Sequence, residues 1–71
     1  MVNHYEVISS LAELAGEYGD NTYSVTTYAL GYIPFKNGEN KVNEVGTKFS
    51  DIAHWLIDEA EQNFNDSLYK K

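Results

Sequence analysis

Residues 49–69 read FSDIAHWLIDEAEQNFNDSLY. Apolar residues in this stretch recur three or four positions apart, which is the spacing of one helical face, and acidic residues fall opposite them. The pattern predicts an amphipathic helix over residues 50–69. At 1.5 Å per residue this helix would be about 28 Å long, enough to cross any sheet that so short a chain can build. The rest of the chain must therefore cover its apolar face, which consists of Ala53, Leu56, Ile57, Ala60, Phe64 and Leu68.

Trp55 departs from this pattern. A rotation of about 100° per residue places it well away from the centre of the apolar face, among acidic side chains. Two interpretations are open: Trp55 packs with Ile52 over the edge of a sheet or under a loop, or it anchors a partner, since Trp surrounded by polar groups is common at interface hot spots. The predicted partner-binding residues on this side of the helix are Trp55, Asp51, Asp58, Glu59, Gln62 and Asp66.

Length and composition predict one small domain over residues 1–71. A domain of this size buries only about 60% of its unfolded surface and has little stability to spare. The chain has no cysteine, so a disulfide or a Cys-based zinc site is not expected. It also has no run of eighteen apolar residues and no N-terminal secretion signal, so we expect a soluble cytoplasmic protein without a membrane span.

The charge balance is strongly acidic. Eleven Asp and Glu residues stand against five Lys residues and no Arg, which gives a formal net charge of −6. Direct nucleic-acid binding is disfavoured, because it requires cations that displace counterions and usually Arg at base edges. A protein partner with a basic surface would be attracted over long range. The alternative is that the charge serves only solubility.

The N-terminal segment predicts a first helix over residues 3–18. Asn3 and Glu6 have the spacing of a capping box, Val2 and Val7 that of a hydrophobic staple, and Gly19 is a suitable stop. The apolar face of this helix should meet the long helix over the sheet. The residues expected to form this core are Leu11, Leu14, Leu56, Ile57 and Phe64.

Residues 22–35 are rich in Thr, Tyr, Val, Ile and Phe, which favour strands. The alternation of side chains is imperfect, so we expect a bulge or turn near residues 29–31 and leave open whether this is one bent strand or two. In the single-strand register, one face would hold Tyr23, Val25, Thr27, Ile33 and Phe35, and the other Tyr28, Leu30 and Tyr32.

Asn37-Gly38 favours a hairpin turn. A two-residue loop there would place Pro34 opposite Lys41 at a hydrogen-bonded position, which Pro34 cannot fill because it has no N–H. We therefore expect a longer loop or an exposed edge position for Pro34. Residues 41–45 are predicted to form a short strand with Val42 pointing inward, and Thr47 or Ser50 to cap the long helix.

Together these elements predict a two-layer α+β fold. A small antiparallel sheet of two or three strands carries both helices on one face, in the order α-β-β(-β)-α. This order is similar to that of the double-stranded RNA-binding domain, but the Lys-rich start of that family's last helix is here Phe49-Ser50-Asp51-Ile52. The similarity is limited to the order of elements.

Catalytic and metal-binding patterns are weak. Asp51, His54 and Asp58 lie on adjacent helical turns and could offer one imidazole and two carboxylates to a divalent metal, but ligands from one exposed helix bind weakly. No nucleophile elbow, phosphate loop or HExxH motif is present, and so short a chain has little material for a cleft. We expect no enzyme activity, no metal and no cofactor.

The sequence therefore favours a non-catalytic acidic module that binds a protein with a basic, nucleic-acid-binding surface, as an inhibitor or nucleic-acid mimic of the phage or mobile-element type. Tyr28 and Tyr32 are added to the predicted partner-binding residues, because Tyr on an uncovered sheet face suits a partner chain. The alternatives are a weak metal-dependent or catalytic role at Asp51, His54 and Asp58, and self-association as a homodimer.

Overall fold

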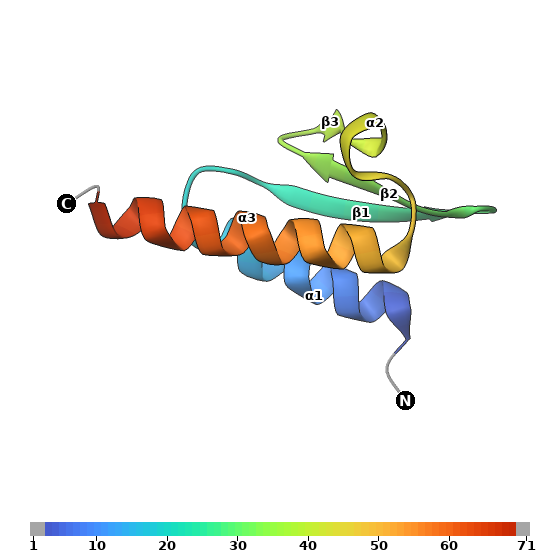
Figure 1. The fold of residues 1–71 in the computed structure, drawn as a ribbon, viewed down its shortest axis with the longest axis horizontal. Helices are drawn as coiled ribbons and strands as arrows, with labels where there is room; N and C mark the ends of the chain where they lie inside the picture. The colour runs from blue at the N-terminus through green and yellow to red at the C-terminus, as the bar shows by residue number, and fades with distance from the viewer. Residues whose placement is uncertain (1–2, 70–71) are drawn as a thin grey trace.

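The computed structural model describes residues 3–69, which form two layers (Figure 1). One layer is an antiparallel sheet in the order β1-β2-β3. Its strands are β1 (Tyr23–Tyr28), β2 (Gly31–Lys36) and β3 (Glu39–Asn40).

Two long helices form the second layer. Helices α1 (His4–Gly16) and α3 (Phe49–Tyr69) lie side by side and run in the same direction (Figure 1). A single helical turn, α2 (Val42–Val45), connects β3 to α3. The predicted two-layer α+β fold is confirmed, with three strands and the order α-β-β-β-α.

Asn3 caps the N-terminus of α1, which is one half of the predicted capping box. Asn3 Oδ1 accepts a hydrogen bond from the backbone N–H of Glu6 at 2.8 Å, which satisfies one free N–H of the first turn. The expected contact of Val2 with Val7 lies outside the described residues. The helix ends at Gly16, two residues earlier than predicted, where Glu17 N donates to Leu14 O at 3.1 Å.

Residues 22–35 form two strands and not one bent strand. Tyr28 pairs with Gly31 across a turn at residues 29–30, and the register continues to Tyr23 opposite Lys36. The predicted face assignment is therefore wrong, because cross-strand partners share a face. The face towards the helices holds Tyr23, Val25, Thr27, Tyr32, Pro34 and Lys36, whereas Ile33 and Phe35 lie on the opposite face.

The turn between β2 and β3 has two residues, contrary to the expected longer loop. Asn37 and Gly38 both have positive φ (54° and 80°), as this tight turn requires. Lys41 N donates to Pro34 O at 2.9 Å, and the missing N–H of Pro34 leaves the Lys41 carbonyl free. That carbonyl accepts from Glu44 N and Val45 N and so starts α2. Val42–Val45 is helical where a strand over residues 41–45 was predicted. Pro34 is buried in the central strand and not at an exposed edge.

The core lies between the helices and the sheet. Ile8, Ile52 and Leu56 are fully buried there, with small residues between them. The predicted positions of Leu14, Ile57 and Phe64 are wrong, since these side chains are 40%, 49% and 44% exposed. Alanine at the helix contact lets α1 and α3 approach closely, so little space remains for larger side chains. The small core residues are Ala12, Ala15 and Ala60.

Candidate protein-binding surface

Trp55 lies against the sheet. Its ring meets that of Tyr23 edge to face, with 5.7 Å between ring centroids, and it packs at the margin of the core. This position agrees with the first interpretation of Trp55, in which the side chain packs over the sheet. Because it is half-buried, a substitution there would alter folding as well as any contact with a partner.

Glu59, one turn further along α3, takes part in a polar network with the sheet. Tyr23 Oη donates to Glu59 Oε1 at 2.7 Å, and Lys36 Nζ lies 2.7 Å from the same oxygen. Lys36 Nζ also stands 5.8 Å from the centroid of the Tyr23 ring. Glu59 therefore ties α3 to both β1 and β2, and its carboxylate is neutralised within the protein.

The ionisation of these groups reflects their contacts. Burial raises the pKa of Glu59, but hydrogen bonds from Lys36 and Tyr23 outweigh it, so the pKa lies below its ordinary value. The hydrogen bond to Glu59 raises the pKa of Lys36. Burial and the hydrogen bond to Glu59 raise the pKa of Tyr23. All three groups are held in the protonation states that favour the network at neutral pH.

Asn63, the last buried residue of α3, completes the network. Its Nδ2 donates to Ala15 O at 3.1 Å and to Tyr23 Oη at 2.9 Å, and its Oδ1 accepts from Asn21 Nδ2 at 3.2 Å. Its three hydrogen-bond partners thus lie on α1, on β1 and in the connection between them. Asn63 was not predicted from the sequence, because its partners are forty or more residues away along the chain and only the fold brings them together.

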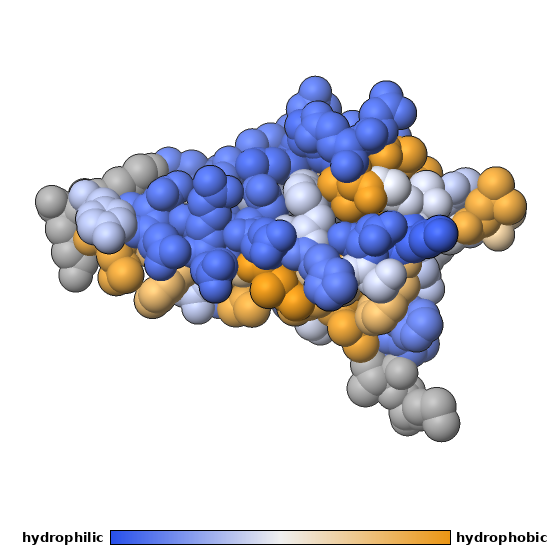
Figure 2. Space-filling view, in the orientation of Figure 1, coloured by the Kyte–Doolittle hydropathy of each residue, from blue (hydrophilic) through white to orange (hydrophobic). Residues whose placement is uncertain are grey.

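The remaining predicted residues of α3 form an exposed row beside Trp55 and Glu59, which we call the acidic edge: Asp51, Asp58, Gln62 and Asp66. Each lies three or four positions from Trp55, Glu59 or another member, and so on the same side of the helix. The row extends over about 22 Å at 1.5 Å per residue. Polar side chains cover this side of α3 along its length (Figure 2).

Unneutralised carboxylates are concentrated on the helical layer. Three of the eleven acidic residues, Glu39, Glu44 and Glu59, form ion pairs with Lys36 or Lys41. The other eight form no ion pair with any residue in the range 3–69. They lie on α1, on α3 or directly after α1, and none lies on a strand: Glu6, Glu13, Glu17, Asp20, Asp51, Asp58, Glu61 and Asp66.

A second surface lies on the side of the helical layer away from the sheet. Leu14, Ile57, Phe64 and Leu68 are between 40% and 53% exposed. Apolar side chains gather along the border between α1 and α3 in Figure 2. We call these four residues, with the half-buried residues beside them, the outer strip; the half-buried members are Val7, Leu11, Tyr18 and Ala53.

The structure does not bring Tyr28 and Tyr32 together. Tyr32 opposes Thr27 on the face towards the helices and is half-buried against the core, whereas Tyr28 is on the opposite face and 39% exposed. The expected row of tyrosines on the open face is therefore wrong. It assumed one continuous strand, and the turn at residues 29–30 reverses the faces.

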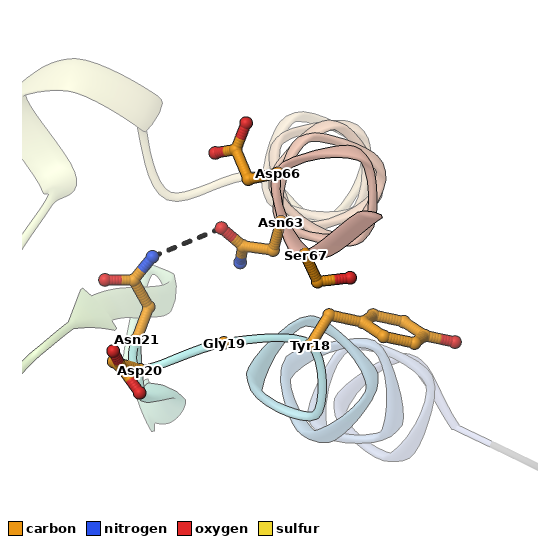
Figure 3. A pocket seen from close by; sticks show the side chains of 7 residues that line it. All are labelled: Tyr18, Gly19, Asp20, Asn21, Asn63, Asp66 and Ser67. Atoms are coloured by element: carbon orange, nitrogen blue, oxygen red, sulfur yellow. Dashed lines mark hydrogen bonds between the residues drawn. The ribbon is translucent and has the colours of Figure 1, made fainter. Parts of the chain in front are cut away.

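A polar cleft of about 440 Å³ lies between the ends of the two helices. Asn63, Asp66 and Ser67 line it from α3, and Asn21 faces them across the Asn21–Asn63 hydrogen bond (Figure 3). Ser67 donates to Phe64 O at 2.7 Å, so its hydroxyl is engaged with the helix backbone and not with a base. The other residues that line the cleft are Tyr18, Gly19 and Asp20.

The candidate metal ligands Asp51, His54 and Asp58 do not converge. In the part of the chain that the structure describes, no three His, Cys, Asp or Glu side chains are placed to hold a metal ion. Nor is any helix between residues 3 and 69 long and apolar enough to span a membrane. No known protein family, curated protein or solved structure matches this chain.

Proposed function

We propose that this protein is a non-catalytic binding module whose acidic edge occupies a basic surface of another protein. The observation that carries the proposal is the distribution of charge. All eight carboxylates without an ion pair among the described residues belong to the helical layer and the turn after α1, while Lys36 and Lys41 are already paired with acidic residues. Such one-sided charge steers association with a cationic surface.

The form of the acidic edge favours this role over simple solubility. Its carboxylates lie on one helix, and the contacts of Trp55 and Glu59 with the sheet hold that helix in place. A preorganised row of charges loses less entropy on binding than charges on a mobile loop. Basic surfaces that present Lys and Arg to nucleic acid are the natural targets, so the protein would act as an inhibitor of nucleic-acid binding of the kind that phages and mobile elements encode.

The test is a pull-down from nuclease-treated lysate with two charge-matched variants. Asp58→Asn with Asp66→Asn removes two charges from the acidic edge. Glu39→Gln with Glu44→Gln removes two charges that pair with Lys41, so the net charge of both variants is −4 (−6 + 2). We expect the first variant to lose the retained protein and the second to keep it.

Kinetic measurements on the retained protein then complete the test. Association should slow as salt rises, because the Debye length falls from about 10 Å at 0.1 M to about 3 Å at 1 M. The retained protein should also release its nucleic acid when this chain binds. Equal loss of binding in both variants, or association that is indifferent to salt, would contradict the proposal.

A further inference from the structure

The outer strip consists of two apolar rows, one on each long helix. On α1 its members Val7, Leu11 and Leu14 recur at intervals of four and three residues, so they form one row along the helix axis, and Tyr18 follows in the turn after α1. On α3, Ile57, Phe64 and Leu68 form a second row in the same way. Because α1 and α3 lie side by side and run in the same direction, the two rows are parallel (Figure 1). An apolar surface of this elongated form suits the apolar face of an amphipathic helix.

Aromatic contacts link both ends of α1 to α3. The Tyr18 ring meets the Phe64 ring edge to face, with 5.1 Å between centroids, and His4 stacks on Phe49 at 4.1 Å. Figure 3 shows the Tyr18 ring pointing away from Asp20 and Asn21, so Tyr18 borders both the polar cleft and the outer strip. The exposed side chains of the outer strip are available to a partner.

The charges beside the outer strip define the partner. Glu17 lies one turn from Leu14, and Glu61 lies one turn from both Ile57 and Phe64, so each carboxylate flanks the outer strip. Neither forms an ion pair with a described residue. A second copy of this chain would bring carboxylates against carboxylates, whereas Lys or Arg beside an apolar face would complement them.

We propose that the outer strip binds an amphipathic helix of a partner protein whose apolar face is flanked by Lys or Arg side chains. The inference rests on the proposed function, since it assumes a basic protein partner and names the type of segment that is bound. It concerns a different surface from the acidic edge, so the two can be tested separately.

The probe is a synthetic peptide of about 18 residues that contains only Leu and Lys, with Leu at helical spacing; as a helix it would be about 27 Å long. Two control peptides are a scrambled sequence of the same composition and the same pattern with Glu in place of Lys. Titration into isotope-labelled protein should shift backbone amide resonances along the outer strip, with saturable binding. The scrambled and Glu-containing peptides should bind at least tenfold more weakly.

Variants on the two surfaces separate the proposals. Ile57→Ser and Leu14→Ser replace exposed side chains on different helices and should each weaken binding of the Leu/Lys peptide about tenfold, with thermal melting of each variant as the folding control. Asp58→Asn with Asp66→Asn should leave peptide affinity within about twofold, although it abolishes the pull-down expected above.

Three outcomes would overturn the inference. Binding of the scrambled peptide as tight as that of the Leu/Lys peptide, or resonance shifts confined to the acidic edge, would show recognition by charge alone, and the proposed function would then stand without a role for the outer strip. A dimer in sedimentation that Ile57→Ser dissociates would assign the outer strip to a second copy. Unchanged peptide affinity in both Ser variants would place the contact elsewhere.

Discussion

The side of α3 that faces the sheet carries Trp55, Glu59 and Asn63, whereas the side that faces away carries Ile57, Phe64 and Leu68. The first group is buried or half-buried, and the second is at least 44% exposed. For these residues of α3, burial therefore depends more on whether their polar atoms find hydrogen-bond partners than on the hydrophobicity of the side chain. Glu59 and Asn63 can be buried because Tyr23, Lys36 and Ala15 satisfy their polar atoms.

The difference between the two sides also explains how the rotation of α3 about its own axis is fixed. Apolar packing alone would tolerate a turn that brings Ile57 and Phe64 inward, since burial is not directional. Such a turn would break the bonds of Glu59 and Asn63 and leave polar groups without partners, which costs about 1–3 kcal/mol for each group. The polar network thus selects which face of the helix packs on the sheet, and the outer strip is left exposed as a consequence.

The largest expected effect comes from a matched pair of leucines on α3. Leu56 is fully buried and Leu68 is 53% exposed. Leu56→Ala should lower the free energy of unfolding by about 2–5 kcal/mol through lost burial and the cavity left behind, while Leu68→Ala should lower it by less than about 1 kcal/mol. Urea unfolding of both variants measures the difference. Similar losses would mean that the outer side of α3 is packed as tightly as the inner side.

The next effect concerns Gly31, which helps to hold the start of α3 on the sheet. Tyr32 N donates to Thr47 O at 3.1 Å, and a Cβ at Gly31 would lie 2.6 Å from that oxygen. Gly31 also has φ of 148°, a backbone conformation that residues with a side chain rarely adopt. Gly31→Ala should cost about 1–3 kcal/mol, whereas Gly19→Ala, which meets no atom within 4 Å, should be close to neutral. An equal response of the two variants in urea unfolding would show that Thr47 yields without cost.

Glu59→Gln tests the polar network with a smaller change. Gln keeps an acceptor for Tyr23 but loses the charge that pairs with Lys36, so we expect a loss of about 2 kcal/mol at pH 7. Because folding lowers the pKa of Glu59, its contribution is present above the unfolded pKa of about 4.3 and is lost as pH falls through the folded value. Because folding raises the pKa of Lys36, the contribution of Lys36 is complete below its ordinary value of 10.5 and is lost as pH rises through the folded value.

The stability difference between the parent and Glu59→Gln should therefore be largest near neutral pH and shrink at both extremes. Thermal melting over a pH series measures it. The control is Glu39→Gln, which alters an exposed ion pair with Lys41 and should have a smaller effect. A difference that is constant from pH 3 to pH 11 would show that the charge of Glu59 contributes nothing.

The sequence was sufficient for the helices, the strand-forming region and the order of elements, because periodicity and capping at Asn3 are local signals. The rotation of α3 was not predictable, since the partners of Glu59 and Asn63 lie on other elements. The hairpin at residues 29–30 was left open because Ala29 and Leu30 do not form a strong turn pair. The available signal for the outer strip was that the apolar residues of the long helix spread over more than one face. The small size of the core, which leaves some of them exposed, was not evident from the sequence.

The smallest expected effect distinguishes the two ends of the acidic edge. Asp51 lies in the first turn of α3, where the helix dipole favours a negative charge, and Asp66 lies near its end, where the dipole opposes one. Asp51→Asn should lower the free energy of unfolding by a few tenths of a kcal/mol, and Asp66→Asn should raise it by a similar amount. Both changes remove one charge, so general repulsion within this acidic chain would shift both variants upward. The signs of the two shifts separate the causes, because the dipole effect is opposite at the two positions and repulsion is not. Unfolding at low salt and at 1 M salt checks that both effects are electrostatic, because screening reduces each of them. A shift in the same direction at both positions would mean that repulsion along the whole edge outweighs the dipole, and that α3 carries its carboxylates at a cost in stability which a basic partner would relieve.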